Sequence, residues 1–585
     1  MRRLALLLAL AAAFPAMTNA QRLSADGAPQ TFNFVAEQFF SEIYFRFSPT
    51  SGTQAGLHQY DTKLEDYSVA EVQREVAALH AIAGKIEAIP AGALDASVQA
   101  DREILLNTIK SELLTLEVIR PWEKNPDTYS SGVANSAFVI MSRAYAPANT
   151  RLKAVVAREL MMPQVLLEAR KNLKNPPRIY TEIALEQIEG NISFFQNDLP
   201  AAFKDADSTV ARAAFAKSNA AVIQALKEYG AWMKTDLLPR SNGDFRFGAE
   251  TYRKKLAYDE MVDLPLERLL EIAYADLHRN QAEFARVARE VDPTKTPQEV
   301  LALLAGIHPP PDQLLETFQS QFSGLIAFIK AHHIVTIPSD VEPTLEETPP
   351  FMRATTQASM DSPGPFETHS TKAYFNVTLP EKGWSAARVA EHMAAFNVGT
   401  ITSTAVHEAY PGHYVQFLYV GQFPSKIRKL LGAATNIEGW AHYCEQMMLD
   451  EGYLPVGADA RQAKLIRLGQ LQDALLRDAR YIVAIRMHTG VGGALTTDEA
   501  ARFFVTEGYQ SASIGSMETK RGTSDATYLY YTLGKLEIMK LREDVKTKQG
   551  AAFSLEAFHD DFMHQGPAPI KVIRKAMLHD ATPVL

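Results

Sequence analysis

Two histidines and a glutamate lie in one short segment, His407-Glu408-Ala409-Tyr410-Pro411-Gly412-His413. Neutral imidazole is a common zinc ligand in proteins. A carboxylate beside such ligands can accept a proton from a water molecule that the metal has made more acidic. The segment therefore favours a metal site, provided that both imidazoles can face the same ion.

The spacing of the two histidines does not fit a regular helix. The zincin pattern His-Glu-x-x-His places its histidines four residues apart, on one helical face. Here they are six residues apart, and six residues of an ideal helix turn through about 600°, which leaves the side chains about 120° apart. Pro411 and Gly412 lie between them, and both residue types interrupt helices. We therefore expect a broken helix that brings both imidazoles to one ion.

A second segment, 436–445, supplies candidates for a third ligand. Glu438, His442 and Glu445 are spaced so that they share one helical face. Ile437 and Trp440 flank this face, which favours a buried helix over a solvated polar one, and a buried carboxylate needs a partner such as a metal. We favour Glu438 as the third ligand, with His442 and Glu445 orienting the ligands from behind. A ligand role for His442 or Glu445 stays open.

Two later helical stripes carry further polar side chains. On the first, Arg480 could bind a substrate carboxylate and His488 could donate to an oxyanion. On the second lie Tyr528, Tyr531 and Lys535, and a tyrosine hydroxyl is a common donor to a tetrahedral intermediate. The alternative for each residue is core packing or a salt bridge.

Most of the chain shows the apolar period of amphipathic helices, clearest over 69–86, 152–173, 209–234 and 266–291. Residues 336–385 differ, because repeated prolines exclude a long helix there. Within that region, 373–379 has the aromatic and β-branched content of a short strand. This strand is expected either to be an edge along which a peptide substrate pairs or to be a surface hairpin strand.

Composition describes an ordinary globular protein, with 46% hydrophobic residues and a formal charge of −9 from 59 basic and 68 acidic residues. This balance argues against a nucleic-acid partner. Residues 1–20 have the basic start, short apolar run and small-residue cleavage site of a signal peptide. No cysteine stands at that site, so a lipoprotein is not expected and the mature chain should have no membrane anchor. The only cysteine, Cys444, is expected to be a buried helix residue without a disulfide.

The two metal-region motifs together resemble the bacterial DUF885 family, which is grouped with the zincin-like (gluzincin) metallopeptidases. The motifs are His407-Glu408-x-x-Pro411-Gly412-His413 and Glu438-Gly439-Trp440-Ala441-x-Tyr443-x-Glu445. The resemblance extends to Gly56-Leu57-His58 near the start and to Phe558-His559-Asp560 with Gly566 near the end. It implies an α-helical zinc hydrolase in which His407, His413 and Glu438 hold the ion and Glu408 is the general base.

The same resemblance covers residues outside the metal motifs. Glu518 and Arg521 match a family Glu-x-x-Arg, and Tyr531 matches a family tyrosine. We expect Tyr531 or His488 to stabilise the oxyanion. Substrate-binding roles are expected for four side chains: Arg480, Arg521, Tyr528 and Lys535.

We therefore expect a mainly α-helical, zincin-like metallopeptidase body with a short β element before the metal-binding helix. An N-terminal helical region, 21–335, and a C-terminal metal-binding catalytic region, 336–585, should form one continuous body around a cleft. The expected function is an exported, periplasmic or secreted bacterial peptidase with one Zn²⁺ per chain, acting on a peptide or small amide. Arg480 or Arg521 would suit a carboxypeptidase. The alternatives are a zinc hydrolase of a non-peptide amide and a non-catalytic binding protein on the same scaffold.

Overall fold

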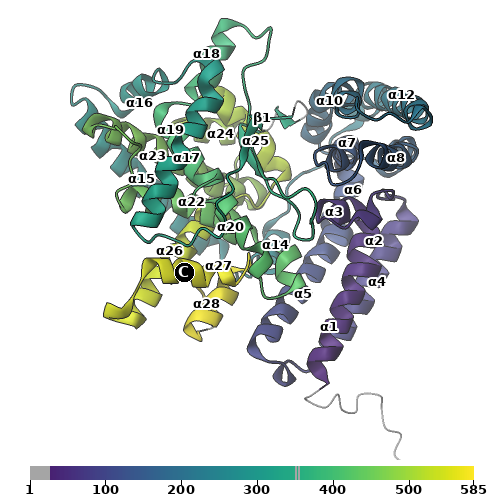
Figure 1. Cartoon of the computed structure of the whole chain (residues 1–585), viewed down its shortest axis with the longest axis horizontal. Helices are drawn as coiled ribbons and strands as arrows, with labels where there is room; N and C mark the ends of the chain where they lie inside the picture. Colours follow the sequence, from purple (N-terminus) through teal and green to yellow (C-terminus); the bar gives the residue numbers. More distant parts are fainter. Residues whose placement is uncertain (1–26, 350–351, 354–355, 581) are drawn as a thin grey trace, which may run out of the picture.

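Helices make up most of the computed structural model, which describes residues 27–349, 352–353, 356–580 and 582–585 (Figure 1). The mainly helical prediction is confirmed. The segment predicted as a signal peptide, 1–20, lies outside the described residues. None of the described helices combines the length and the apolar character that a membrane crossing requires.

The first part of the chain forms a group of helices on one side of the molecule, drawn in purple and blue in Figure 1. One apolar stretch, 152–173, is divided into two helices, because Pro163 occupies the first turn of the second one, where a missing N–H is tolerated. The bounds are α1 (Ala28–Gln38), α2 (Phe45–Phe47), α3 (Pro49–Gln54), α4 (Val69–Glu87), α5 (Ala96–Leu114), α6 (Pro121–Lys124), α7 (Asp127–Met141), α8 (Ala148–Glu159), α9 (Met162–Asn172), α10 (Arg178–Ser193), α11 (Leu199–Ala202), α12 (Thr209–Trp232) and α13 (Leu238–Arg240).

The remaining helices form the larger body on the other side (Figure 1). The helix expected over 266–291 is present as α15 and shares an apolar cluster with α23, so residues from both sides of position 335 pack in one core. The bounds are α14 (Ala249–Asp259), α15 (Leu266–Val291), α16 (Pro297–Ala305), α17 (Leu314–Ala331), α18 (Ala386–Ala394), α19 (Val398–Glu408), α20 (His413–Leu418), α21 (Lys426–Leu430), α22 (Ala434–Asp450), α23 (Ala460–Thr489), α24 (Thr497–Thr506), α25 (Ala512–Ser524), α26 (Tyr530–Gln549), α27 (Leu555–His564) and α28 (Ile570–Leu578).

A small mixed sheet lies before the metal-region helices. Its strands are β1 (Thr344–Glu347), β2 (Ala358–Asp361) and β3 (Tyr374–Val377), in the order β1-β3-β2. The strand predicted over 373–379 is confirmed as β3, but β3 is the central strand and is largely buried. The expectation of an edge or surface strand at this position is therefore wrong, because β3 pairs on both sides and the edge strands are β1 and β2.

The register shows which way β2 directs its backbone. Thr378 donates its N–H to the carbonyl of Gln357 at 2.8 Å, and β2 and β3 are antiparallel. Hydrogen-bonded pairs alternate with non-bonded pairs in such a ladder. The N–H and C=O groups of Ala358 and Met360 therefore point away from β3, toward the outer edge of the sheet.

Two close helix crossings position the elements of the metal region. At the first, Gly399 of α19 lies against Gly469 of α23; at the second, Gly439 of α22 lies against Gly534 of α26. A Cβ atom at Gly439 would lie 2.6 Å from the Cα of Gly534, and one at Gly534 would overlap the carbonyl oxygen of Thr435. Because glycine has no Cβ, the backbones can approach to this distance.

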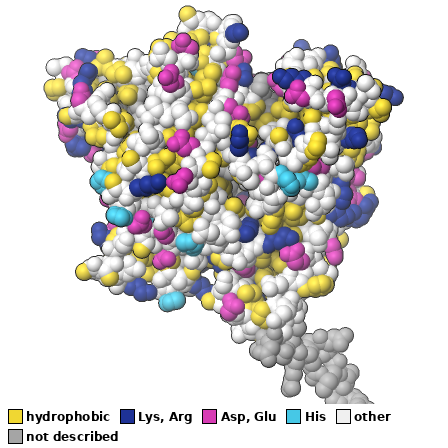
Figure 2. Space-filling view, in the orientation of Figure 1, with side chains coloured by type: hydrophobic (Ala, Val, Ile, Leu, Met, Phe, Trp, Pro, Cys, Tyr) yellow, Lys and Arg dark blue, Asp and Glu magenta, His cyan; other side chains and the backbone are white. Residues whose placement is uncertain are grey.

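Acidic and basic side chains are interspersed over the face shown in Figure 2, without a broad field of one sign. Such a surface offers no extended basic track for a phosphate backbone. The expectation of no nucleic-acid partner stays a prediction.

We predict that Gly534→Ala destabilises the protein by about 1–3 kcal/mol, because the added methyl group overpacks the crossing of α22 and α26. Thermal unfolding and urea titration measure this. Gly84→Ala is the matched control: Gly84 lies within α4 and nothing stands near its Cβ position, so alanine there should be neutral or stabilising. Equal effects of the two substitutions would contradict the role given to the crossing.

Candidate metal centre

The helix carrying the first metal-region motif breaks between its two histidines, as predicted. Helix α19 ends at Glu408 and α20 begins at His413. In the connection, Gly412 donates its N–H to the carbonyl of Val406 at 3.0 Å. A Cβ atom at Gly412 would overlap the carbonyl oxygen of His407, so this tight reversal requires glycine. The break returns the chain so that His413 lies beside His407.

Three side chains converge at this point. The Nε2 atoms of His407 and His413 lie 3.5 and 3.4 Å from the same Oε2 atom of Glu438, and the three ligand atoms all lie within 4.8 Å of one another. In a tetrahedral zinc site with bonds of about 2.0–2.1 Å, ligand atoms are separated by about 3.4 Å. The spacing of the cluster therefore fits one metal ion.

Burial also favours a cation here. The Oε2 atom of Glu438, which faces both imidazoles, is buried without a hydrogen-bond partner among the described residues, and a buried polar atom without a partner is costly. Burial alone would raise the pKa of Glu438, but His413 and His407 hold it well below its usual range. The carboxylate is thus charged and can serve as a ligand.

Glu445 supports the cluster from behind. His407 directs Nδ1 at Glu445 Oε1, 2.7 Å away, which leaves Nε2 facing the cluster. The same carboxylate contacts His442 Nδ1 at 3.0 Å and Arg477 Nη2 at 3.0 Å. Burial would raise the pKa of Glu445, but Arg477 and His442 hold it well below its usual range. His442 contacts Glu445 and does not belong to the three-residue cluster.

A cavity of about 610 Å³ opens beside the cluster. It is lined by residues of β2, α19, α22, α23, α25 and α26, and the three cluster residues belong to its wall. Glu408, the neighbour of His407, also lines it, and its side chain makes no hydrogen bond or ion pair with the residues that the structure describes. A carboxylate is thus available next to the cluster to exchange protons with a bound molecule.

The cavity wall also contains Tyr531, surrounded by guanidinium groups. Arg480 and Arg521 lie 4.8 and 5.8 Å from the centre of its ring, and Arg521 Nη2 donates to Tyr531 Oη at 3.2 Å. Arg480 makes two hydrogen bonds of 2.7 Å to Glu518, one to each carboxylate oxygen. The side chain of Arg521 is 35% exposed, and its ion pair with Asp525, at 3.2 Å, is longer than the contacts between Arg480 and Glu518. Arg521 is therefore better placed than Arg480 to meet an added anion.

The family match covers residues 49–577 and is described as bacterial protein of unknown function (DUF885). The chain belongs to this family. A solved structure from Shewanella oneidensis, described as a putative lipoprotein of unknown function, is 26% identical with a TM-score of 0.76 and covers 95% of this chain and 100% of its own. The structure of a putative lipoprotein from Colwellia psychrerythraea is 17% identical with a TM-score of 0.77, and the match covers 95% of this chain and 99% of that chain. At this identity, the likeness indicates a shared fold and no more. Among curated proteins, none matches this chain.

Three predicted residues of the DUF885 chain lie away from the cavity. Lys535 is buried against Asp276, with 3.2 Å between Nζ and Oδ2, and burial lowers its pKa to about 8. Tyr528 is fully buried below α25. Neither residue lines the cavity, so their expected contact with substrate is not supported by the geometry.

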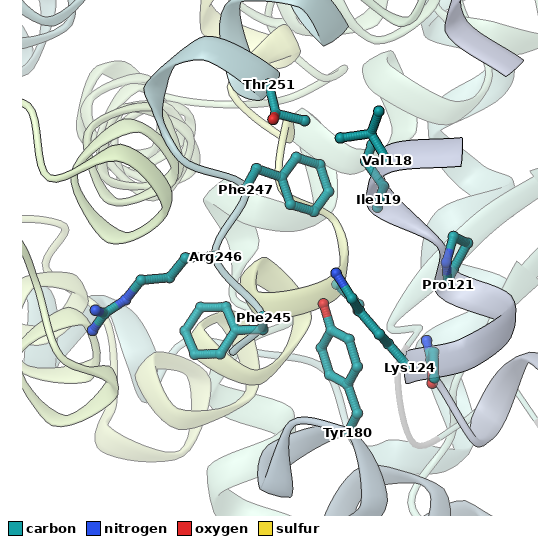
Figure 3. A pocket seen from close by; sticks show the side chains of 11 residues that line it. Val118, Ile119, Pro121, Lys124, Tyr180, Phe245, Arg246, Phe247 and Thr251 are labelled. Atoms are coloured by element: carbon teal, nitrogen blue, oxygen red, sulfur yellow. The ribbon is translucent and has the colours of Figure 1, made fainter. Parts of the chain in front are cut away.

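His488 is the third residue away from the cluster. Its Nε2 atom donates to the carbonyl of Gly522 at 2.7 Å, and burial lowers its pKa to about 4. Phe245 and Phe247 pack edge-on against its ring, and both also line a separate cavity of about 120 Å³ (Figure 3). His488 is therefore a buried packing residue here, and its expected contact with an oxyanion is not supported.

The structure adds residues to which the sequence assigned no role. Arg477 shares the stripe of Arg480 and contacts Glu445. One turn before it, Asp473 lines the cavity, and burial raises its pKa to about 6. The i, i+4 spacing of Asp473 and Arg477 was the sequence signal that could have indicated that they lie on one face of the helix. No sequence signal pointed to Ala358 and Met360, because β2 lacks the β-branched residues that are typical of a strand.

We predict that metal affinity rises with pH up to about 9. Burial would lower the pKa of His407, but Glu438 and Glu445 raise it to about 9 in the metal-free protein. The ion pairs of His407 thus stabilise the metal-free fold fully below about pH 6.5 and are lost as the pH rises through 9. An incoming metal must displace that proton, so affinity should increase by up to about tenfold per pH unit below 9.

Calorimetry of metal binding in buffers of different ionisation enthalpy measures the proton released. In Glu445→Gln, which lacks one of the carboxylates that raise the pKa of His407, the rise in affinity should level off at a lower pH. Affinity that stays constant between pH 6 and 9 would contradict this protonation of His407.

Proposed function

We propose that this DUF885 protein is an exported, zinc-dependent metallopeptidase that hydrolyses peptide bonds with an activated water molecule. The observation that carries the proposal is the placement of Glu408: it adjoins a ligand of the His407, His413 and Glu438 cluster and lines the same cavity. A protein that only binds metal or ligand has no need of a buried, unpaired carboxylate at this position. Export is supported by the description of the related Shewanella oneidensis structure as a putative lipoprotein.

The donor set, two imidazoles and one carboxylate, is typical of catalytic zinc with an open coordination position. When bound, zinc would supply Lewis-acid chemistry, making water more acidic and a carbonyl more electrophilic. Glu408 accepts the proton of the attacking water and returns it to the leaving amine. Glu445 fixes the ring of His407 through Nδ1 and so keeps Nε2 aimed at the ion.

Tyr531 is the proposed donor to the oxyanion. Its ring lies 6.5 Å from that of His407, centre to centre. Because its hydroxyl oxygen accepts a hydrogen bond from Arg521, its own proton is free to point into the cavity. A donor held in place before the reaction stabilises developing negative charge without reorganisation.

The edge of β2 supports a peptide as substrate. Ala358 and Met360 line the cavity and direct their backbone N–H and C=O groups to the outer edge of the sheet. An extended peptide can pair with such an edge through main-chain hydrogen bonds, independently of its sequence. A small amide without a peptide backbone would leave this edge unused.

We predict that the purified protein carries about one zinc per chain and that each of the substitutions His407→Ala, His413→Ala and Glu438→Ala removes it. Glu408→Gln should keep zinc and lose about 10²–10⁴-fold in kcat, the range expected for a missing general base. Metal analysis and a peptide-library assay measure both. Glu451→Gln, at an exposed position beyond α22, is the control and should change neither.

Zinc retention with full activity in Glu408→Gln would overturn the mechanism. A wild-type protein that cannot be loaded with zinc would overturn the function.

We further propose that Arg521 binds the carboxylate of a substrate C-terminus, which makes the enzyme a carboxypeptidase. Arg521→Met should then raise KM about tenfold or more for free peptides, the loss expected for a charge-assisted hydrogen bond. Peptides with an amidated C-terminus should be poor substrates of the wild type, and the substitution should not raise their KM. Equal cleavage of free and amidated peptides would establish endopeptidase action instead.

A further inference from the structure

The wall of the cavity formed by β2 is anchored outside the metal-binding half. Residues 362–373, the β2–β3 loop, reach the N-terminal helices, where Phe366 donates its N–H to the carbonyl of Ala55 at 2.9 Å. The backbones meet closely on both sides of this bond. A Cβ atom at Gly364 would overlap the carbonyl oxygen of Gln54, and one at Gly56 would overlap the N atom of Glu367.

His58 holds this loop from the side of the N-terminal helices. Its Nε2 atom lies 3.1 Å from Glu367 Oε2 in the loop, and its Nδ1 atom lies 3.2 Å from Asp61 Oδ2. Tyr145 stacks on the imidazole, with ring centres 3.6 Å apart, and donates its hydroxyl proton to Asp61 at 2.6 Å. Carboxylates accept and do not donate, so both contacts are made when His58 carries two N–H groups, and both are then charge-assisted.

Glu367 uses its second oxygen inside the loop. Its Oε1 atom accepts the backbone N–H groups of His369 and Ser370 at 2.7 and 3.1 Å, and its side chain is 2% exposed. One buried carboxylate therefore shapes the loop and joins it to His58.

Arg143 is a second anchor and acts on both strands. Its Nη2 atom lies 2.7 Å from Asp361 Oδ1, at the end of β2, and its Nη1 atom donates to the carbonyl of Lys372 at 2.6 Å, just before β3. The guanidinium also lies 5.7 Å from the ring centre of Tyr374, the first residue of β3. A single guanidinium group on the N-terminal side thus joins the two ends of the β2–β3 loop.

We propose that His58 and Arg143 are positioning residues that fix the β2 edge at the cavity, so that the N-terminal helices set the substrate-binding wall of the enzyme. Neither residue lines the cavity, so each acts through β2. This inference rests on the proposed function, because β2 is the edge along which the peptide is proposed to pair.

The test uses the full-length, zinc-loaded protein with His58→Gln and Arg143→Met. Hydrogen exchange should become about tenfold faster or more over 357–377 in each variant, the effect expected when a charge-assisted hydrogen bond to a locally opening segment is lost. Exchange in α23 and the zinc content should be unchanged. KM for an extended peptide should rise by a similar factor, whereas kcat at saturation should be retained.

His80→Gln is the matched control for His58→Gln. His80 also contacts a carboxylate, Glu117 at 3.2 Å, but it is an exposed residue of α4 and makes no contact with the β2–β3 loop. Its substitution should leave both exchange and KM unchanged.

The outcomes separate this inference from the proposed function. Unchanged exchange over 357–377 in both variants, or faster exchange with an unchanged KM, overturns the positioning role and leaves the peptidase standing. A zinc-loaded wild type that cleaves no peptide overturns the peptidase, and with it this inference, even where exchange responds. A fall in kcat and loss of zinc in His58→Gln would show general structural damage and also overturn it.

Discussion

The candidate metal centre depends on one buried carboxylate, that of Glu445. It contacts His407 of α19, His442 of α22 and Arg477 of α23, so a single charge links the three helices that form the back of the cavity. A buried charge without partners would cost several kcal/mol, and these contacts remove that cost while fixing the orientation of one ligand. Because Glu445 holds Nδ1 of His407, the Nε2 atom of that ring keeps its direction toward the cluster.

Such a contact requires the helices to be held at a fixed separation, and close backbone packing provides it. The crossing at Gly399 and Gly469 joins α19 to α23, and the crossing at Gly439 and Gly534 joins α22 to α26. Three of these helices carry partners of Glu445, and the fourth carries Tyr531. Backbone-to-backbone contacts leave no flexible side chain between the helices, so a shift of one is passed to its neighbour. The same glycines therefore serve the fold and the alignment of the cluster.

The local chemistry of the cluster could be predicted from sequence, whereas its surroundings could not. The break at Pro411–Gly412 follows from residue type, and the spacing of Glu438 and Glu445 follows from helical geometry. A shared stripe, however, does not mean a shared cavity. His488 stands eight residues after Arg480, about 12 Å further along the axis of α23, and that distance takes it to a different part of the core. Helical periodicity predicts which residues share a face of a helix, but it does not predict how far along that face the functional site extends.

The sheet shows the same limit over a longer range. The composition of 373–379 correctly indicated a strand, but whether a strand is central or at an edge depends on its partners, and β1 and β2 have little strand character in their sequences. The segment Gly56-Leu57-His58 was visible as part of the family resemblance without any apparent chemistry. Its histidine meets Glu367 across 309 positions of the chain. A contact of that range leaves no local pattern, since each partner alone is an ordinary polar residue outside the long helices and the strands. The candidate metal ligands could be found because they are close in sequence; the residues that shape the cavity around them become visible only when the chain is folded.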